Sequence, residues 1–214
     1  MKNTQKDKTD CGGGIRVIGL TGGTGSGKSE AARRLDELGF PTINADTIGH
    51  ELLLPGGEAE ADVINAFGPG ITTDNHIDRS KLGARVFSDP EARRILNNIV
   101  HPRIKKEIKR RIHSLAQKGY KTVIVDAALI AESGEREPCL DSLILVTCPE
   151  EVRVQRLMKA RNLTSEEALQ RVRSQTPPET KLALADWVLD NKGELEGFLK
   201  RVERLAAELR AYED

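Results

Sequence analysis

Gly22-Gly23-Thr24-Gly25-Ser26-Gly27-Lys28-Ser29 is the stretch of the chain that decides its fold. It matches the pattern GxxxxGK[ST] in full, follows an apolar strand-like run and opens a helical pattern, which is the setting of a phosphate-binding loop. Glycines let backbone N–H groups surround a polyphosphate, the lysine adds a charge beside it, and the last serine can bind Mg²⁺. The residues predicted to bind nucleotide are Gly23, Gly25, Ser26, Gly27, Lys28, Ser29 and, through its backbone N–H, Glu30. The motif alone leaves ATPase, GTPase and kinase open.

On both sides of this motif, short apolar runs alternate with helical patterns. The strand-like runs are Ile15–Thr21, Phe40–Asn44, Thr122–Asp126, Ser142–Thr147 and Trp187–Asp190. The expected helices are Lys28–Leu38, Asp89–Gln117, Glu150–Arg161, Ser165–Gln175 and Glu194–Tyr212. Pro102 should kink or divide the second of them. Nearly continuous apolar strands are typical of a parallel sheet covered on both faces. The sequence therefore predicts an α/β fold of the three-layer P-loop class, with a parallel five-stranded sheet.

Length and charge limit the possible classes of protein. The chain has 214 residues, with 33 Lys and Arg against 33 Asp and Glu, so its net charge gives no indication of nucleic-acid or membrane binding. No apolar run approaches the roughly 18 residues that span a bilayer. Residues 1–14 lack the apolar stretch of a signal peptide, so we expect a disordered leader there and a cytoplasmic protein. We expect one P-loop domain over 15–214, with a helical insertion at about 48–118 and a helical lid at about 150–177.

Two aspartates stand where predicted strands end. Asp46 closes Asn44-Ala45-Asp46 after the second strand, and Asp126 ends the third. Ligands of open α/β sheets bind at the carboxyl ends of strands. Asp46 could therefore orient and deprotonate an attacking hydroxyl, and Asp126 could hold Mg²⁺ through water. The alternatives are structural: Asp46 as the N-cap of a helix from Thr47, and Asp126 as a turn residue. Position alone leaves both open.

Cations crowd the two predicted helices after the fourth strand: Arg153, Arg156, Lys159, Arg161, Arg171 and Arg173. Phosphoryl transfer needs cations around the moving group. For any single member, a solvated helix face with glutamate partners is the alternative.

His101, which precedes Pro102, is either structural or on the substrate side. Asn191-Lys192-Gly193 follows the fifth strand, where backbone groups could frame a nucleotide base; by itself this stretch indicates only a turn.

From Ile15 to about Leu209 the chain resembles the dephospho-CoA kinase family. The shared pieces, in chain order, are Gly-Leu-Thr-Gly-Gly-x-Gly-Ser-Gly-Lys-Ser at 19–29, Ala45-Asp46, Pro55-Gly56, Phe67-Gly68, Ile77-Asp78-Arg79, His101-Pro102-x-Ile104, Arg171, Gln175, Lys181 with Ala185-Asp186, and Asn191-x-Gly193. The ordered set, rather than any one piece, carries the resemblance. It implies ATP-dependent phosphorylation of the ribose 3′-hydroxyl of dephospho-CoA, the last step of coenzyme A biosynthesis, with ATP and Mg²⁺.

The resemblance also implies roles for single residues. The catalytic residues would be Asp46 as general base with Lys28 and Arg156; the nucleotide contacts would include Asn191 and Gly193; the metal ligands would be Ser29 and Asp126; and the substrate contacts would be His101, Arg79, Arg161 and Arg171. Family members often carry Asp-Ala-Asp where this chain has Asn44-Ala45-Asp46. The family's arginine spacing also shifts by one residue near Arg161, which favours Arg156 as the lid cation.

Two other functions remain open on the residues alone. One is another small-molecule kinase on the same scaffold, of the nucleoside monophosphate, shikimate or gluconate type. The other is a nucleotide-binding regulatory module. The resemblance favours dephospho-CoA as the small-molecule partner, with no nucleic-acid or membrane partner. The residues do not indicate an oligomeric state.

Overall fold

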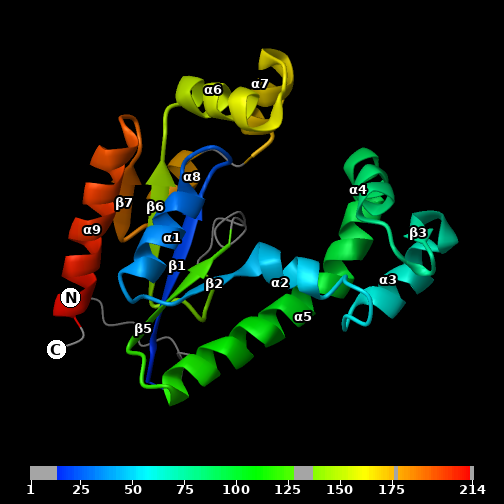
Figure 1. The fold of residues 1–214 in the computed structure, drawn as a ribbon, viewed down its shortest axis with the longest axis horizontal. Helices are drawn as coiled ribbons and strands as arrows, with labels where there is room; N and C mark the ends of the chain where they lie inside the picture. Colours follow the sequence, from blue (N-terminus) through cyan, green and yellow to red (C-terminus); the bar gives the residue numbers. More distant parts are fainter. Residues whose placement is uncertain (1–13, 128–136, 176–177, 213–214) are drawn as a thin grey trace. The chain divides into compact units, whose positions relative to one another are not determined.

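The computed structural model describes residues 14–127, 137–175 and 178–212, and Figure 1 shows its fold. The chain divides into two compact units. The first consists of Met1–Ile43 with Ile112–Asp214, and the second of Asn44–Arg111. Residues 1–13 of the expected leader and residues 176–177 of the expected lid lie outside the described residues.

A parallel sheet with the strand order β2-β5-β1-β6-β7 forms the centre of the first unit (Figure 1). Its strands are β1 (Arg16–Gly22), β2 (Thr42–Asn44), β5 (Thr122–Asp126), β6 (Ser142–Thr147) and β7 (Trp187–Asp190). The predicted five-stranded parallel sheet is confirmed. In the register of the central strand, Leu20 lies opposite Asp126 of β5, and Gly22 lies opposite Val146 of β6. The ends of β5 and β6 therefore lie beside the loop that follows β1.

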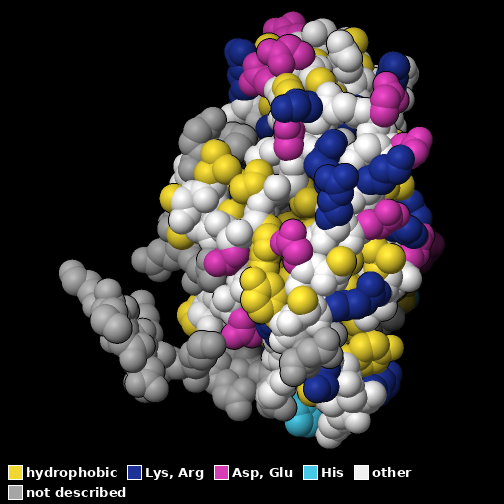
Figure 2. Space-filling model, turned by 90° about the vertical axis from the view of Figure 1, so that its left-hand side faces the viewer, with side chains coloured by type: hydrophobic (Ala, Val, Ile, Leu, Met, Phe, Trp, Pro, Cys, Tyr) yellow, Lys and Arg dark blue, Asp and Glu magenta, His cyan; other side chains and the backbone are white. Residues whose placement is uncertain are grey.

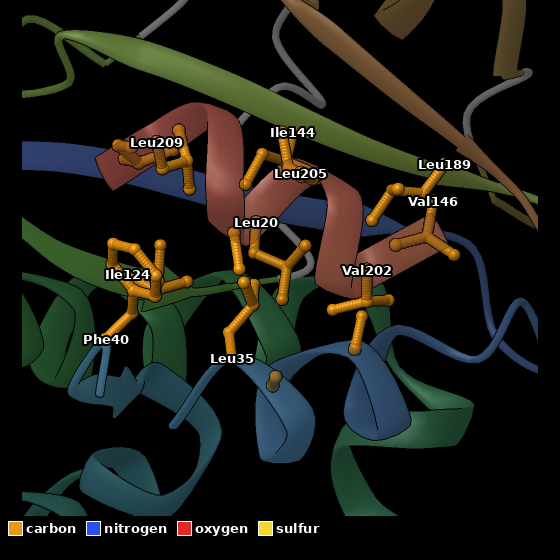
Figure 3. Packing of buried hydrophobic residues seen from close by; sticks show 14 of the residues in the cluster. Leu20, Leu35, Phe40, Ile124, Ile144, Val146, Leu189, Val202, Leu205 and Leu209 are labelled. Atoms are coloured by element: carbon orange, nitrogen blue, oxygen red, sulfur yellow. The ribbon is translucent and has the colours of Figure 1, made fainter. Parts of the chain in front are cut away.

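Two helices cover one face of this sheet, and the core lies beneath them. α1 (Lys28–Glu37) and α9 (Leu195–Ala211) are amphipathic, so each buries one apolar stripe. Figure 3 shows Leu35 of α1 and Leu205 and Leu209 of α9 packed against Leu20 and Ile144 of the sheet. These side chains are at most 4% exposed, so the hydrophobic effect holds α1, and the loop before it, against the sheet.

Three further helices belong to the first unit: α6 (Glu150–Arg161), α7 (Ser165–Arg173) and α8 (Pro178–Leu182). Leu157 of α6 packs on Ala168 and Val172 of α7. A capping box starts α7, because the Thr164 side chain accepts from the Glu167 backbone and Glu167 accepts from the Thr164 backbone. The sequence did not indicate α8, which contacts β6.

The second unit is mainly helical. It contains α2 (Ala45–Glu51), α3 (Glu60–Phe67), the 3₁₀ turn η1 (Pro69–Ile71), α4 (Arg79–Ser88) and the greater part of α5 (Pro90–Gln117). It also has an antiparallel hairpin of β3 (Thr72–Thr73) and β4 (His76–Ile77), which was not predicted. Asp74 and Asn75 both have positive φ, 51° and 64°, as a two-residue hairpin turn requires.

The helix α5 continues through Pro102, so the expected division at this residue is wrong. Proline removes one backbone donor, and the acceptor that loses its partner is the carbonyl of residue 98, one turn earlier. Pro102 and Asn98 are both exposed, and water can therefore hydrate that carbonyl. The helix loses one hydrogen bond at a solvated position instead of ending.

The surface carries both signs of charge. On the face displayed in Figure 2, basic and acidic side chains are spread over the same area. This mixture agrees with the equal numbers of the two kinds in the sequence. Among the helices in the described part of the chain, none combines the length and the apolar character that crossing a membrane requires.

Candidate functional site

The loop between β1 and α1 has the backbone of an anion-binding site. Gly25 and Gly27 have φ values of +78° and +96°, a region that glycine enters without steric cost. Within the described residues, the N–H groups of Gly25, Gly27, Lys28 and Ser29 have no hydrogen-bond acceptor. Several unpaired N–H groups at the start of a helix attract an anion through their dipoles and the helix dipole. The local structure therefore fits the predicted phosphate-binding loop.

Lys28 and Asp126 form an ion pair at this loop. The Asp126 side chain is 1% exposed and that of Lys28 is 13% exposed. Asp126 reaches this position because β5 pairs with β1 and ends opposite Leu20. A charge as buried as that of Asp126 needs a partner of opposite sign, which Lys28 supplies. The structure therefore brings together these two predicted site residues, from segments that are far apart in the sequence.

Side chains from two later segments hold Thr24 in the loop. The Thr24 carbonyl accepts a hydrogen bond from Arg153 Nε at 2.8 Å. The Thr24 N–H donates to Gln175 Oε1 at 2.7 Å, and the same oxygen accepts from Arg153 Nη2 at 2.8 Å. Both backbone groups of Thr24 are thus bonded to side chains of the expected lid region.

Asn191 and Arg156 contact the next two residues of the loop. The buried Asn191 donates from Nδ2 to the Ser26 carbonyl at 2.7 Å. Arg156 Nη1 donates to the Gly25 carbonyl at 3.3 Å, and Arg156 Nη2 donates to Asn191 Oδ1 at 3.3 Å. Arg156, predicted as a lid cation, therefore lies against the loop backbone. The predicted nucleotide contact Asn191 has its side chain engaged with the loop.

Beside the loop, a small pocket is lined by Gly23, Ser26, Leu145, Val146, Thr147, Cys148, Arg153 and Lys181. Burial lowers the pKa of the Arg153 guanidinium from its ordinary value. Burial also raises the pKa of the Cys148 thiol, against the smaller opposite influence of Arg156 and Arg153. The Ser26 hydroxyl is buried and has no hydrogen-bond partner among the described residues. The Ser26 contacts that hold the loop are therefore made by its backbone.

The remaining predicted nucleotide contacts lie at the surface. The Ser29 side chain is exposed at the start of α1, where a ligand could reach its hydroxyl. Glu30 pairs with Arg33 at 2.9 Å and turns away from the loop, so only its backbone could serve a nucleotide. Gly193 is exposed, with open space where a Cβ would stand.

Asp46 lies in the first turn of α2, and the alternative that it caps this helix is wrong. Asn44 is the N-cap, because its side chain accepts from the Thr47 backbone at 2.8 Å. Asp46 is exposed, and its side chain makes no hydrogen bond or ion pair among the described residues. Its carboxylate is therefore available to a ligand, whereas the structural task assigned to it belongs to Asn44.

The predicted substrate contacts are distributed over both units. In the second unit, Arg79 begins α4 and donates from Nη2 to His50 Nε2 at 3.0 Å, while His101 is half-buried on α5. In the first unit, Arg161 and Arg171 are exposed on α6 and α7, and their side chains make no hydrogen bond or ion pair among the described residues. These contacts do not bring the four residues together, and their roles stay predictions.

Sequence reasoning missed the parts that Arg153 and Gln175 play at the loop. Arg153 stood in the cationic cluster and Gln175 in the ordered set of family residues, but neither was singled out. They contact Thr24 across 129 and 151 residues of sequence, respectively. No local pattern reports a contact over such a distance.

The chain is similar to known proteins both in sequence and in structure. A family model described as dephospho-CoA kinase matches residues 16–197. A dephospho-CoA kinase of Carboxydothermus hydrogenoformans is 42% identical over 189 residues, covering 88% of this chain and 91% of the relative. Among solved structures, TT1252 from Thermus thermophilus matches with a TM-score of 0.76 and 33% identity, covering 91% of this chain and 98% of the other. A dephospho-CoA kinase from Campylobacter jejuni matches with a TM-score of 0.64 and 28% identity, over 91% and 97%.

Proposed function

Because the chain belongs to the dephospho-CoA kinase family, we propose that it transfers the γ-phosphoryl group of ATP to the ribose 3′-hydroxyl of dephospho-CoA. In this reaction an O3′–P bond forms, the bond from Pγ to the bridging oxygen breaks, and ADP leaves. The observation that carries the proposal is a phosphate-binding loop with unpaired N–H groups, in a chain whose family match extends over residues 16–197. The rival small-molecule kinases and the regulatory module have no comparable support.

The loop and Lys28 are proposed to hold the phosphates of ATP. The N–H groups of Gly25, Gly27, Lys28 and Ser29 would donate to phosphate oxygens, and the start of α1 would add its dipole. Lys28 Nζ contacts Asp126. On ATP binding we expect Lys28 to turn toward the β- and γ-phosphates, because their negative charge exceeds that of one carboxylate. Lys28 would then neutralise charge that moves during transfer.

Ser29 and Asp126 would hold Mg²⁺. Both offer oxygen ligands, which this ion prefers, and Asp126 is a buried carboxylate at the loop. Among the described residues, no group of three or more His, Cys, Asp or Glu side chains could bind a metal by itself. The ion would therefore take its other ligands from the phosphates and water. When bound, Mg²⁺ supplies charge that neutralises the phosphate oxygens.

Asp46 is proposed to orient the 3′-hydroxyl of the substrate and to accept its proton. The support is its exposed carboxylate in the first turn of α2, without a competing side-chain partner in the described part of the chain. A hydroxyl is a weak nucleophile, and removal of its proton as the O–P bond forms avoids a positively charged product oxygen. The residue that caps α2 is Asn44, so this role does not conflict with a structural one.

The two helical regions are proposed to complete the site around dephospho-CoA. Residues 48–118 would bind the substrate, with Arg79 and His101 as contacts. Residues 150–177 would form a lid whose Arg156, Arg161 and Arg171 approach the transferred group, while Asn191 and Gly193 frame the adenine of ATP. A closed lid keeps water from the γ-phosphoryl group and so prevents ATP hydrolysis. The cytoplasm remains the proposed location.

A direct assay tests the proposed reaction. Purified protein with ATP and Mg²⁺ is offered dephospho-CoA, AMP, shikimate or gluconate in separate reactions, and ADP release is measured together with the mass of the product. We expect turnover with dephospho-CoA only, and a product heavier by one phosphoryl group at the ribose. Turnover with another acceptor, or ADP release without a phosphorylated acceptor, would reject the assignment.

A further inference from the structure

The phosphate-binding loop turns three consecutive carbonyl groups toward side chains from elsewhere in the first unit. The pairs are Thr24 with Arg153 Nε at 2.8 Å, Gly25 with Arg156 Nη1 at 3.3 Å, and Ser26 with Asn191 Nδ2 at 2.7 Å. We call the three donating side chains the carbonyl bracket. Its members come from α6 and from the residue after β7, so distant segments hold one face of the loop.

Holding these carbonyls also sets the direction of the N–H groups. The described chain has no cis peptide bond, and in a planar trans peptide the C=O of one residue points opposite to the N–H of the next. The carbonyl bracket therefore turns the N–H groups of Gly25, Ser26 and Gly27 to the other side of the loop. Ser26 N–H closes a turn onto the Gly23 carbonyl at 3.0 Å. Those of Gly25 and Gly27 lack an acceptor among the described residues and remain for a ligand.

Burial makes two bracket members effective donors. Arg153 is 6% exposed and Asn191 is 3% exposed, so water competes little for their hydrogen bonds. Arg153 donates to neutral oxygens of Thr24 and Gln175, and no carboxylate of the described residues lies within ion-pair distance of it. Glu150 acts on Arg153 only at longer range, and a buried cation that lacks a close anionic partner is unfavourable. A polyphosphate bound in the loop would supply the missing negative charge.

Close packing ties the same side chains to the glycines of the motif. A Cβ atom on Gly27 would lie 2.1 Å from Asn191 Nδ2, and one on Gly23 would lie 2.4 Å from Arg153 Nη2. Distances this short exclude a side chain at either position unless the bracket moves. Because glycine has no side chain, these two positions leave room for the bracket side chains on one face of the loop and for a ligand on the other.

We propose that Arg153, Arg156 and Asn191 are positioning residues that hold the phosphate-binding loop with its N–H groups directed at the nucleotide. The inference rests on the proposed function only in that this loop binds ATP. It gives Arg156 a task at the loop in addition to the proposed one in the lid, where a cation would meet the γ-phosphoryl group only during transfer.

The two tasks predict different kinetics. Loop N–H groups contact phosphates in the bound substrate and in the transition state alike, so loosening the loop weakens both by a similar amount. Such uniform loss raises Kd and KM for ATP and leaves kcat nearly unchanged. A cation used only in the transition state lowers kcat and leaves the Kd of ATP unchanged.

The experiment measures binding of ATP, inorganic tripolyphosphate and adenosine, with kcat and KM for ATP, in bracket variants of the full chain. Asn191→Leu keeps the approximate size of the side chain and removes the donor without adding a charge, and Arg153→Met keeps length but removes charge and donors. Arg153→Lys is the conservative variant. Arg204→Gln alters an exposed residue on α9, outside the loop and the proposed lid, and serves as the control. Thermal melting of each variant checks that it is folded.

We expect Kd for ATP and for tripolyphosphate to rise by roughly 10- to 100-fold in Asn191→Leu and Arg153→Met, the loss that follows removal of one buried or charged hydrogen bond. Arg153→Lys should recover part of this loss, and adenosine binding and kcat should change by less than about 3-fold. Unchanged phosphate affinity in both folded variants overturns the proposal, as does a loss confined to ATP and adenosine, which would mark a base contact. A wild-type chain that binds ATP but leaves dephospho-CoA unphosphorylated would reject the proposed reaction and leave this test intact.

Discussion

The phosphate-binding loop of the first unit and the first turn of α2 in the second unit are built in opposite ways. In the loop, the carbonyl groups of three consecutive residues are bonded to Arg153, Arg156 and Asn191. On α2, the Asp46 carboxylate is exposed and makes no side-chain bond among the described residues. The comparison indicates that the fold itself sets the shape of the nucleotide site. The Asp46 carboxylate, in contrast, would find its hydrogen-bond partner only in the substrate hydroxyl.

The comparison would be contradicted most strongly if Lys28 could be replaced without loss of activity. Lys28→Ala should lower kcat/KM by roughly 10³- to 10⁵-fold, as expected when a cation that stabilises the moving phosphoryl group is lost. The core beneath α1 does not use this side chain, but the buried Asp126 loses its ion-pair partner, so the variant should be folded and less stable than the wild type. Turnover and far-UV circular dichroism are measured together, and Arg204→Gln is the control for loss of one charge. If Lys28→Ala turned over at the wild-type rate, the loop would have no part in catalysis.

Asp46→Asn tests the other half of the comparison. The change keeps the size and removes the charge, so kcat should fall by roughly 10²- to 10⁴-fold, the range of acid–base catalysis. The Kd of ATP should change far less, because the loop is set by other residues. Asn44 caps α2, so the melting temperature should stay near that of the wild type. A folded variant with normal phosphorylation of dephospho-CoA would exclude Asp46 from the mechanism.

A smaller effect tests whether Asn44, rather than the Asp46 carboxylate, caps α2. Asn44→Ala removes the acceptor for the Thr47 N–H and should lower the free energy of unfolding by about 1 kcal/mol. Asn44→Asp is the matched control, since aspartate caps as well as asparagine and should keep the stability. Urea unfolding gives both values. Equal stability of the alanine and aspartate variants would contradict the assignment of the cap.

The smallest effect concerns surface ion pairs on α5 of the second unit. Hydrogen bonds from Arg110, followed by those from Arg111, lower the pKa of Glu107 from 4.5 to about 2. A lowered carboxyl pKa stabilises the fold above the unfolded value and loses that contribution as the pH falls toward the folded value.

Glu107→Gln should therefore destabilise the protein at pH 7, by no more than about 1 kcal/mol because the group is partly exposed and screened. Urea unfolding of wild type and variant at pH 7, 4.5 and 3 should show this difference shrinking below pH 4.5. A difference that stays constant or grows on acidification would show that these ion pairs do not act through the charge of Glu107.

The sheet could be predicted because its strands carry a strong local signal. The bounds of β5, β6 and β7 coincide with the runs Thr-Val-Ile-Val-Asp, Ser-Leu-Ile-Leu-Val-Thr and Trp-Val-Leu-Asp. The hairpin of β3 and β4 escaped notice because each strand has two residues, too few for a periodic pattern. Pro102 was expected to kink or divide its helix, and only the division is wrong, because the effect of a proline depends on whether water can reach the freed carbonyl, which the sequence does not state.

The site could be predicted only as far as its residues are neighbours in the chain. The loop is one continuous motif, and its positive-φ glycines at 25 and 27 follow from it. The contacts of Thr24 with Arg153 and Gln175 come from tertiary packing and leave no local signature. Arg79, His101, Arg161 and Arg171 remain predictions, because their tasks depend on a substrate and on the positions that the helical regions take around it.

The buried hydroxyl of Ser26 has a consequence for the thermal stability of the protein. A buried polar group without a partner disfavours the folded state by roughly 1–3 kcal/mol relative to one that is bonded. Ser26 Oγ has no partner in the described residues, and the loop contacts of Ser26 use its backbone. An alanine there would keep those contacts and remove the unsatisfied oxygen. Position 26 is thus one place where a substitution inside the phosphate-binding motif could raise the melting temperature.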